Sequence, residues 1–89
     1  MRIIYQGQIG VVAGLTSEER EVGVETTVAE LISEIAAEKS AEVAKFLMSG
    51  EGEVNSSLFV ALDDDHILDK GVKVGAAREL LLMPPMAGG

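Results

Sequence analysis

The residues with the clearest chemical implication are the last seven of the 89-residue chain, which read Met-Pro-Pro-Met-Ala-Gly-Gly at 83–89. Because glycine has no Cβ, the main chain at Gly88 and Gly89 can enter a channel too narrow for any other residue. Prolines fix their own φ and favour extended conformations in the residues before them. We therefore expect 84–89 to form an extended, flexible tail whose last four residues reach at most about 13 Å.

The pattern indicates that the carboxylate of Gly89 is itself the reactive group. The rest of the tail, which would lie in a partner's channel, comprises Pro84, Pro85, Met86, Ala87 and Gly88.

A pair of glycines at the end of a chain has a second interpretation. Chain ends are often frayed, and small residues there often have no role. On that view the chain is a non-reactive binding module in which Gly88 and Gly89 are incidental. The two interpretations predict different results when Gly89 is deleted, because only a reactive carboxylate needs that residue.

The charge balance of the chain narrows the class of partner. It contains 15 acidic and 7 basic residues, which give a net charge of −8. The phosphates of nucleic acid would be repelled by such a surface, so we expect no nucleic-acid partner and favour a basic protein partner. The chain has no cysteine, which excludes disulfides, thiolate zinc sites and a cysteine nucleophile. Any sulfur chemistry must therefore use a group other than a side-chain thiol.

The length of the chain allows one small domain with little room for an enclosed active site. It has no apolar run of roughly 18 residues, the length that a membrane span needs, and its first residues lack the pattern of a secretory signal. We therefore expect a cytoplasmic protein without a membrane partner. Asp63, Asp64, Asp65 and His66 have side chains that can bind metals, but consecutive carboxylates in a turn are usually solvated. We expect no metal site there.

Local patterns predict where the strands lie. Residues 2–8 begin with β-forming side chains, and 20–25 alternate between apolar and acidic side chains, so both segments are predicted strands. Residues 58–62 are apolar throughout, which is typical of a strand that is covered on both sides or central in a sheet. Short extended pieces within 67–74 and a last strand at 79–83 follow.

A capping box marks the start of the main helix. Thr27 and Glu30 are spaced so that hydroxyl and carboxylate satisfy each other's backbone donors. Apolar residues at helical spacing then form one stripe, which comprises Val28, Leu31, Ile32, Ile35 and Ala36. Ser40 can cap a shorter helix that ends at Gly50. The order of elements predicts an α+β domain over 1–83, with both helices on one face of a small mixed sheet.

Three stretches of the chain resemble the family of small, sulfur-carrying subunits of molybdopterin synthase. The ending at 84–89 resembles the Pro-Pro-x-x-Gly-Gly ending of that family, with Met86 where valine is usual. Residues 58–62, followed by 65–68, resemble its central strand and acidic turn. Residues 8–14, a glycine-punctuated connection with room for one helical turn, resemble the segment after its first strand. The resemblance covers nearly the whole chain and implies a ubiquitin-like β-grasp fold.

The resemblance also implies a chemistry and a set of partners. An adenylating enzyme of the ubiquitin-activating type would use ATP to form an acyl-adenylate on Gly89, and a sulfur donor protein would leave a thiocarboxylate there. Inserted into the large subunit of molybdopterin synthase, the thiocarboxylate would donate its sulfur to cyclic pyranopterin monophosphate. The chain would bind no cofactor itself and would not be catalytic alone. Exposed apolar side chains near the tail, with Met83 and Met86 as candidates, would form the docking surface.

Other functions are compatible with the same residues. Gly10 and Val11 stand where the family usually carries a basic-acidic pair, and 75–78 replaces an Asp-Gly-Asp turn, so the docking partner stays open. Carriers that serve thiamine, cysteine or thiolated tRNA share the fold and the ending. A ubiquitin-like modifier conjugated to lysines would need the same activation of its terminus.

Overall fold

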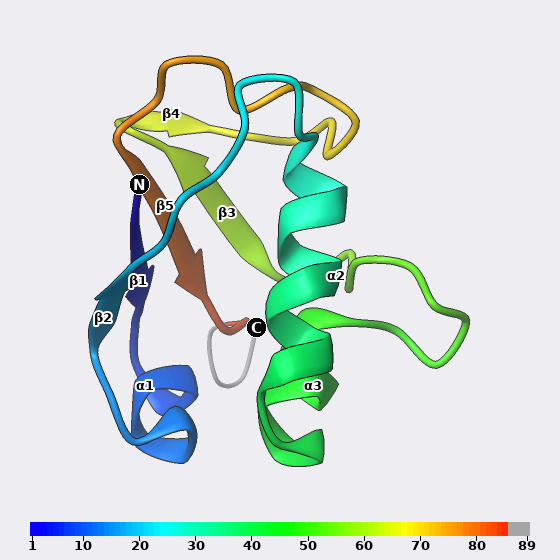
Figure 1. Cartoon of the computed structure of the whole chain (residues 1–89). Coiled ribbons are helices and arrows are strands. Elements are labelled where there is room, and N and C mark those ends of the chain that lie inside the picture. Colours follow the sequence, from blue (N-terminus) through cyan, green and yellow to red (C-terminus); the bar gives the residue numbers. More distant parts are fainter. Residues whose placement is uncertain (86–89) are drawn as a thin grey trace.

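The structure, a computed structural model, describes residues 1–85 and is built on one mixed sheet (Figure 1). The five strands follow the order β2-β1-β5-β3-β4. Their bounds are β1 Arg2–Tyr5, β2 Ser17–Glu19, β3 Phe59–Leu62, β4 Asp65–His66 and β5 Glu79–Met83. The central pair, β1 and β5, runs parallel, and every other neighbouring pair is antiparallel. The α+β architecture predicted from the sequence is confirmed.

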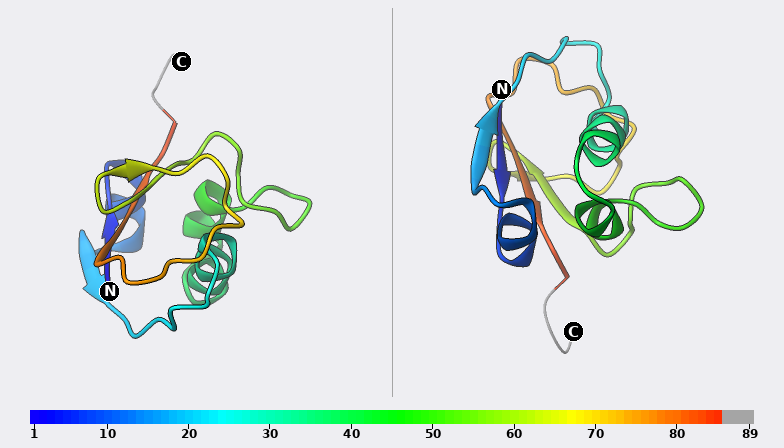
Figure 2. Two further views of the ribbon diagram at one scale, coloured as in Figure 1. Left: turned by 90° about the horizontal axis from the view of Figure 1, so that it is seen from above. Right: turned by 60° about the horizontal axis from the view of Figure 1, so that its bottom comes forward.

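The helices α2 (Val28–Glu38) and α3 (Ala41–Leu47) cover one face of this sheet (Figure 2). The predicted capping box begins α2, because the Glu30 N–H donates to Thr27 Oγ1 at 3.1 Å and the Thr27 N–H donates to Glu30 Oε1 at 2.8 Å. Ser40 caps α3 by accepting a hydrogen bond from the backbone of Val43. No helix in the part of the chain that the structure describes has the length and apolar character needed to cross a membrane.

The core lies between the sheet and these two helices. Its side chains come from alternate positions of β1, β3 and β5 and from the predicted apolar stripe of α2, all of which is buried. The fully enclosed members with relative exposures of at most 2 % are Ile3, Tyr5, Ile9, Val28, Leu31, Ile32, Ile35, Val43, Leu47, Leu58, Val60, Leu80 and Leu82. This core forms one apolar layer between the sheet and the helices.

The second strand differs from the sequence-based prediction, which placed it at 20–25. It lies at Ser17–Glu19 instead, where it pairs with β1, and its last ladder contact is the Arg20 N–H donating to the Met1 carbonyl at 2.9 Å. Beyond that point β1 offers no further partner. The chain bends toward the start of α2, where the Gly75 N–H donates to the Val24 carbonyl at 3.1 Å. Val24 is therefore exposed in a loop, although alternation alone suggested a strand face.

The first strand is shorter than predicted, because the connection at 8–14 is a complete short helix. This helix, α1, spans Gln8–Ala13 and is bounded by Gly7 and Gly14, which have φ angles of 58° and 78°. Gly10 allows α1 to lie directly on the end of β1: a Cβ there would sit 2.6 Å from the Tyr5 carbonyl oxygen. The close approach of backbone to backbone fixes the corner where β1 passes into α1.

The acidic turn after β3 has a structural role. Asp63 adopts a left-handed backbone with φ 53°, which Asp tolerates better than most residues. Its Oδ1 accepts the backbone N–H groups of Arg78 at 2.9 Å and Glu79 at 3.1 Å, and so holds the start of β5. Within residues 1–85 no group of three or more acidic, His or Cys side chains is placed to hold a metal ion. The turn chemistry predicted for 63–65 is confirmed at Asp63.

Candidate functional site

The base of the tail is anchored where β5 meets the start of α1. The Gln6 N–H donates to the Leu82 carbonyl at 2.9 Å, which extends the pairing of β1 and β5 by one residue. Pro84 then lies against Gly7, where an added Cβ would be 3.5 Å from Pro84 Cγ. Pro84 is half-buried and Pro85 is exposed. The chain therefore leaves the fold beside the β1–α1 corner, which Figure 1 and the right view of Figure 2 show at one end of the molecule.

The other predicted tail residues cannot be placed in this way. Met86, Ala87, Gly88 and Gly89 lie outside the described residues. The reactive role of Gly89, the extended and flexible tail, and the domain boundary between 83 and 84 therefore stay predictions.

An apolar patch lies on part of the sheet face that carries no helix. Along β5, Leu80 and Leu82 are fully buried on the helix side, so Leu81 and Met83 point to the opposite face, where both are partly exposed. The strand register places Ile4 beside Leu81 and Phe59 beside Met83. We call these four partly exposed side chains the outer-face patch: Ile4, Phe59, Leu81 and Met83.

An aromatic pair extends this patch to the edge strand β4. The imidazole of His66 stacks on the ring of Phe59, with ring centroids 4.3 Å apart and an interplanar angle of 18°. His66 is exposed, and the ladder pairs it with Ala61, which is in turn the partner of Leu81. The exposed face thus carries apolar and aromatic side chains from β1 across β5 and β3 to β4.

Sequence analysis identified one member of this patch, Met83, and missed the other three. The structure places Met83 on the outer face at the last position of β5, one residue before Pro84. A signal for the rest was present in 80–83, which reads Leu-Leu-Leu-Met. A strand with consecutive apolar residues has two apolar faces, although helices cover only one of them here. Which residues of β1 and β3 share the exposed face depends on the register, which the sequence alone does not specify.

A charged cluster joins the opposite sheet edge to the end of α2. Glu18 accepts hydrogen bonds from Lys39 Nζ at 2.7 Å and from the Tyr5 hydroxyl at 3.1 Å. Arg20 makes two hydrogen bonds, of 3.0 and 2.7 Å, to the carboxylate of Glu38. In the sequence Glu18 stands in a run of charged residues, which would usually be a solvated surface, but folding brings Lys39 and Tyr5 to it. The cluster fixes β2 against the end of α2.

The same contacts shift the proton affinities of the cluster. Burial acts to raise the pKa of Glu18, but the hydrogen bonds from Lys39 and Tyr5 and the nearby positive charges outweigh it, so this pKa lies below its ordinary value of 4.5. The hydrogen bond from Arg20 lowers the pKa of Glu38. Burial, and then the negative charge of Glu18, raise the pKa of the Tyr5 hydroxyl. These shifts favour ionised Glu18 and Glu38 carboxylates and a protonated Tyr5 hydroxyl, which are the forms that make the hydrogen bonds of the cluster.

We expect Glu18→Gln to lower the free energy of unfolding by about 1–2 kcal/mol at pH 7, because a charge-assisted acceptor is lost while Lys39 stays partly buried. A carboxyl whose pKa is lowered by folding stabilises the protein above its ordinary pKa, and this contribution is lost as the pH falls through the folded pKa. The difference between wild type and variant should therefore shrink below about pH 4 in denaturant titrations. Glu21→Gln, at an exposed position, is the matched control. A difference that stays constant with pH would contradict the assignment.

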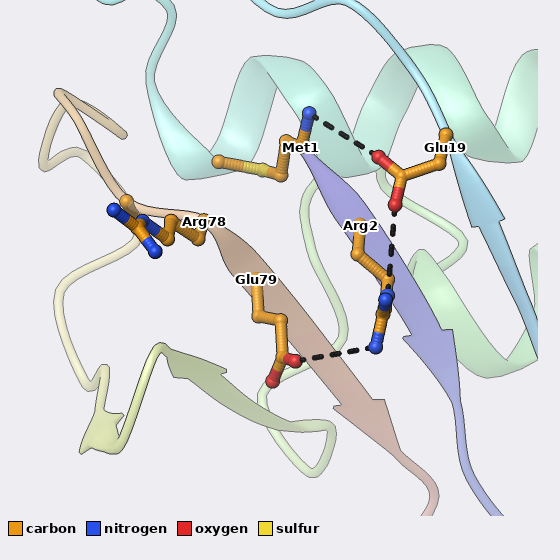
Figure 3. A pocket seen from close by; sticks show the side chains of 6 residues that line it. Met1, Arg2, Glu19, Arg78 and Glu79 are labelled. Atoms are coloured by element: carbon orange, nitrogen blue, oxygen red, sulfur yellow. Dashed lines mark ion pairs between the residues drawn. The ribbon is translucent and has the colours of Figure 1, made fainter.

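A polar hollow at the far end of the sheet is a weaker candidate for a site. It has a volume of about 440 Å³ and lies between the starts of β1 and β5 (Figure 3). Arg2 bridges Glu19 at 3.6 Å and Glu79 at 3.8 Å across it. These pairs are exposed and therefore contribute little binding energy. Because β1 and β5 are parallel, the hollow lies at the opposite end of the sheet from Pro84.

Comparisons with solved structures identify the fold. The chain is similar to SAMP1 from Haloferax volcanii, with a TM-score of 0.83 at 20% identity over 99% of this chain and 97% of that one. It is similar to the Haloferax volcanii protein HVO 2177, with a TM-score of 0.79 at 23% identity over 99% and 84% of the two chains. A protein from Pyrococcus furiosus assigned as subunit 1 of a molybdopterin converting factor gives a TM-score of 0.73 at 17% identity, over 96% and 95%. At these identities the likeness establishes the fold, which is the predicted ubiquitin-like β-grasp.

The family is established by a match along the sequence itself. Comparison with curated proteins gives no significant match. The ThiS family matches residues 3–89, which include both the described domain and the glycines that follow it. The chain therefore belongs to the ThiS family and has the fold of the ubiquitin-like sulfur carriers and modifiers.

Proposed function

We propose that this chain is a sulfur carrier whose Gly89 carboxylate is adenylated and then converted into a thiocarboxylate. The observation that carries the proposal is the ThiS family match, which extends through the Gly-Gly ending at 88–89. The position of Pro84 supports it, because the chain leaves the fold at the end of β5, directly beside Met83 of the outer-face patch. A partner that holds this patch would have the following residues within reach of its own active site.

The chemistry needs an activating enzyme, because a free carboxylate is a poor electrophile. In the proposed first step the Gly89 carboxylate attacks the α-phosphorus of ATP, and pyrophosphate leaves. In the second step a sulfide equivalent attacks the acyl carbon, and AMP leaves, so that one sulfur replaces one oxygen. Glycines at 88 and 89 allow the main chain to approach the nucleotide closely. The chain has no cysteine, so its own terminus is the group that would carry sulfur.

The proposed destination of the sulfur is cyclic pyranopterin monophosphate, with this chain as the small subunit of molybdopterin synthase. The similarity to a protein assigned as a molybdopterin converting factor subunit supports this choice. The partners would be the large subunit, an adenylating enzyme that binds ATP, and a sulfur donor protein, all in the cytoplasm. The chain itself would hold no cofactor and would act only within the complex. Its net charge of −8 favours basic docking surfaces on these partners.

The outer-face patch is the proposed docking surface for these partners. Partly exposed Leu81 and Met83 lie on the strand that leads into the tail, and the Phe59–His66 stack lies beside them. Interface centres are typically apolar and aromatic with a polar rim. Methionine at position 83 suits a surface that must fit an activating enzyme and a synthase subunit in turn, because its side chain is unbranched and adaptable.

A second candidate function is protein modification. The similarity to SAMP1, a small archaeal modifier protein, supports this alternative. A modifier would undergo the same adenylation, but a lysine amine rather than sulfide would then attack the acyl carbon. Sulfur carriers for thiamine, cysteine or tRNA thiolation are further alternatives, because they share the activated terminus.

Intact-mass measurement after incubation with ATP, the adenylating enzyme and sulfide separates these functions. We expect the whole population of carrier to gain the mass of one exchange of oxygen for sulfur, and to stay unchanged when ATP is omitted. Protein-sized adducts on lysines in the presence of a lysate would support the modifier. A chain that stays unchanged under every condition would contradict both and support the non-reactive binding module.

The destination of the sulfur needs a second step. Thiocarboxylated chain mixed with the large synthase subunit and cyclic pyranopterin monophosphate should lose its sulfur and yield molybdopterin. The same material mixed with a thiazole synthase or a tRNA thiolation enzyme serves as the comparison. Transfer only in one of those reactions would overturn the molybdopterin assignment and leave the carrier chemistry in place.

A further inference from the structure

A second hollow, which has an apolar floor, lies on the helix side of the tail's point of exit. It is a cleft of about 350 Å³ between α1 and α3, lined by Gln8, Val12, Glu42, Lys45 and Phe46. Val12 and Phe46 form its floor, since both are partly buried and pack against the core. The other three side chains are exposed and form a polar rim. The cleft thus has the composition of a small binding site: an apolar floor with few polar groups around it.

Exposed apolar surface continues from this cleft along α1. Val11 is 72% exposed, far more than the apolar side chains of the outer-face patch, which are only partly exposed. On a helix, residues three and four apart are neighbours, so Val11 and Val12 lie on the same side as Gln8 at the rim. Val11 belongs neither to the hydrophobic core nor to the partly buried side chains that pack against it. The fold therefore does not require an aliphatic side chain at this position.

The cleft is close to the place where the chain leaves the domain. Gly7 precedes α1 as its N-cap residue, and the Pro84 ring lies against it. The six residues of α1 span about 9 Å. A specific protein interface buries about 800 Å² on each partner, equivalent to a disc of about 16 Å radius. A partner centred on Pro84 would therefore cover α1 and the cleft as well as the end of the outer-face patch.

We propose that the cleft between α1 and α3 is a second docking point, which takes one aliphatic or aromatic side chain of the adenylating enzyme. This inference rests on the proposed function, because that enzyme must enclose the residues after Pro85. The outer-face patch and the cleft lie on opposite sides of the tail's exit, so contacts at both would fix the direction in which the tail enters a channel. The cleft has a volume of about 350 Å³, which lies at the lower end of the range of about 300–1,000 Å³ for small-molecule pockets. It therefore has room for one anchor side chain. Anchors of this kind commonly supply most of the binding energy of an interface.

Two variants at exposed positions test the cleft without removing a core side chain. Val11→Glu places a charge on the apolar side of α1, and Gln8→Trp places an indole over the cleft. Leu68→Glu is the matched control, because Leu68 is 80% exposed and lies in the loop that contacts the start of α2, away from the tail. Melting curves first establish that all three variants are folded.

The measurement is ATP–pyrophosphate exchange by the purified adenylating enzyme of the same organism, with the carrier as the varied substrate. We expect KM for the carrier to rise at least fivefold in Val11→Glu and in Gln8→Trp, and to change less than twofold in Leu68→Glu. A smaller rise in either cleft variant, or an equal rise in Leu68→Glu, overturns the second docking point. If wild type supports exchange while the cleft variants match it, only this inference fails. If wild type supports no exchange, the proposed function fails and the inference with it.

Discussion

Deletion of Gly89 should reduce adenylation of the chain at least a hundredfold while leaving its melting temperature unchanged. A tail shorter by one residue ends about 3.5 Å further from the nucleotide. A misplacement of about 1 Å at a reacting group can already cost a hundredfold in rate. Stability should not change, because every buried hydrophobic side chain of the described residues lies between Ile3 and Leu82. ATP–pyrophosphate exchange and a thermal melt measure the two quantities on the same sample.

Gly88→Ala and Gly89→Ala test the same site without shortening the chain. Both should lower adenylation strongly, because a Cβ would stand where the main chain must approach the nucleotide. Gly50→Ala is the matched control: Gly50 is exposed, and an added Cβ there would meet nothing within 4 Å. A drop of several degrees in the melting temperature of the tail variants would show that these glycines stabilise the fold. Full adenylation of a chain that lacks Gly89 would end the proposal that its carboxylate reacts.

Leu31→Ala should destabilise the domain by about 2–5 kcal/mol, the usual cost of truncating a buried leucine. Leu31 is fully buried at the centre of the apolar face of α2, between the helix and the sheet. In a domain of this size such a loss corresponds to a fall in melting temperature of more than about 10 °C. Denaturant titration gives the free energy, and differential scanning calorimetry gives the melting temperature.

The control and the functional outcome for Leu31→Ala separate folding from chemistry. Ser33→Ala, at an exposed position of the same helix, should change stability by less than about 0.5 kcal/mol. Adenylation of Leu31→Ala should fall only in proportion to its unfolded fraction, because Leu31 is remote from the tail's exit. A loss of less than 1 kcal/mol would mean that the core tolerates the cavity, in conflict with the complete burial of this side chain.

Features that depend on residues close together in the chain could be predicted from the sequence. The start of α2 was predicted correctly, because a capping box needs only Thr27 and Glu30, three positions apart. Its buried stripe followed from helical periodicity, and the turn at Asp63 followed from the chemistry of one side chain. These local signals were enough to predict an α+β fold with helices on one face of the sheet. They also singled out the Gly-Gly ending and Met83, which made the terminus the candidate reactive group.

Features that depend on the pairing of distant segments were decided by the tertiary structure. The second strand lies at Ser17–Glu19 rather than 20–25, because hydrogen bonding to β1 prevails over the alternation pattern that follows it. Lys39 reaches Glu18 across 21 positions of sequence, so no local pattern indicated that cluster. The outer-face patch required the register of β1, β3 and β5, since a shift by one residue would exchange its members with those of the core.

By itself, the sequence determined what the protein presents: an acidic surface without cysteine and a chain ending in two glycines after two prolines. These features can be known from the sequence because composition and a terminal motif do not depend on how the chain folds. Only the tertiary structure decided from where that ending is presented, since the contact of Pro84 with Gly7 joins residues 77 positions apart and places the exit between the outer-face patch and the α1–α3 cleft. The physical reason is that such contacts form only when the parallel pairing of β1 with β5 brings the two ends of the domain together.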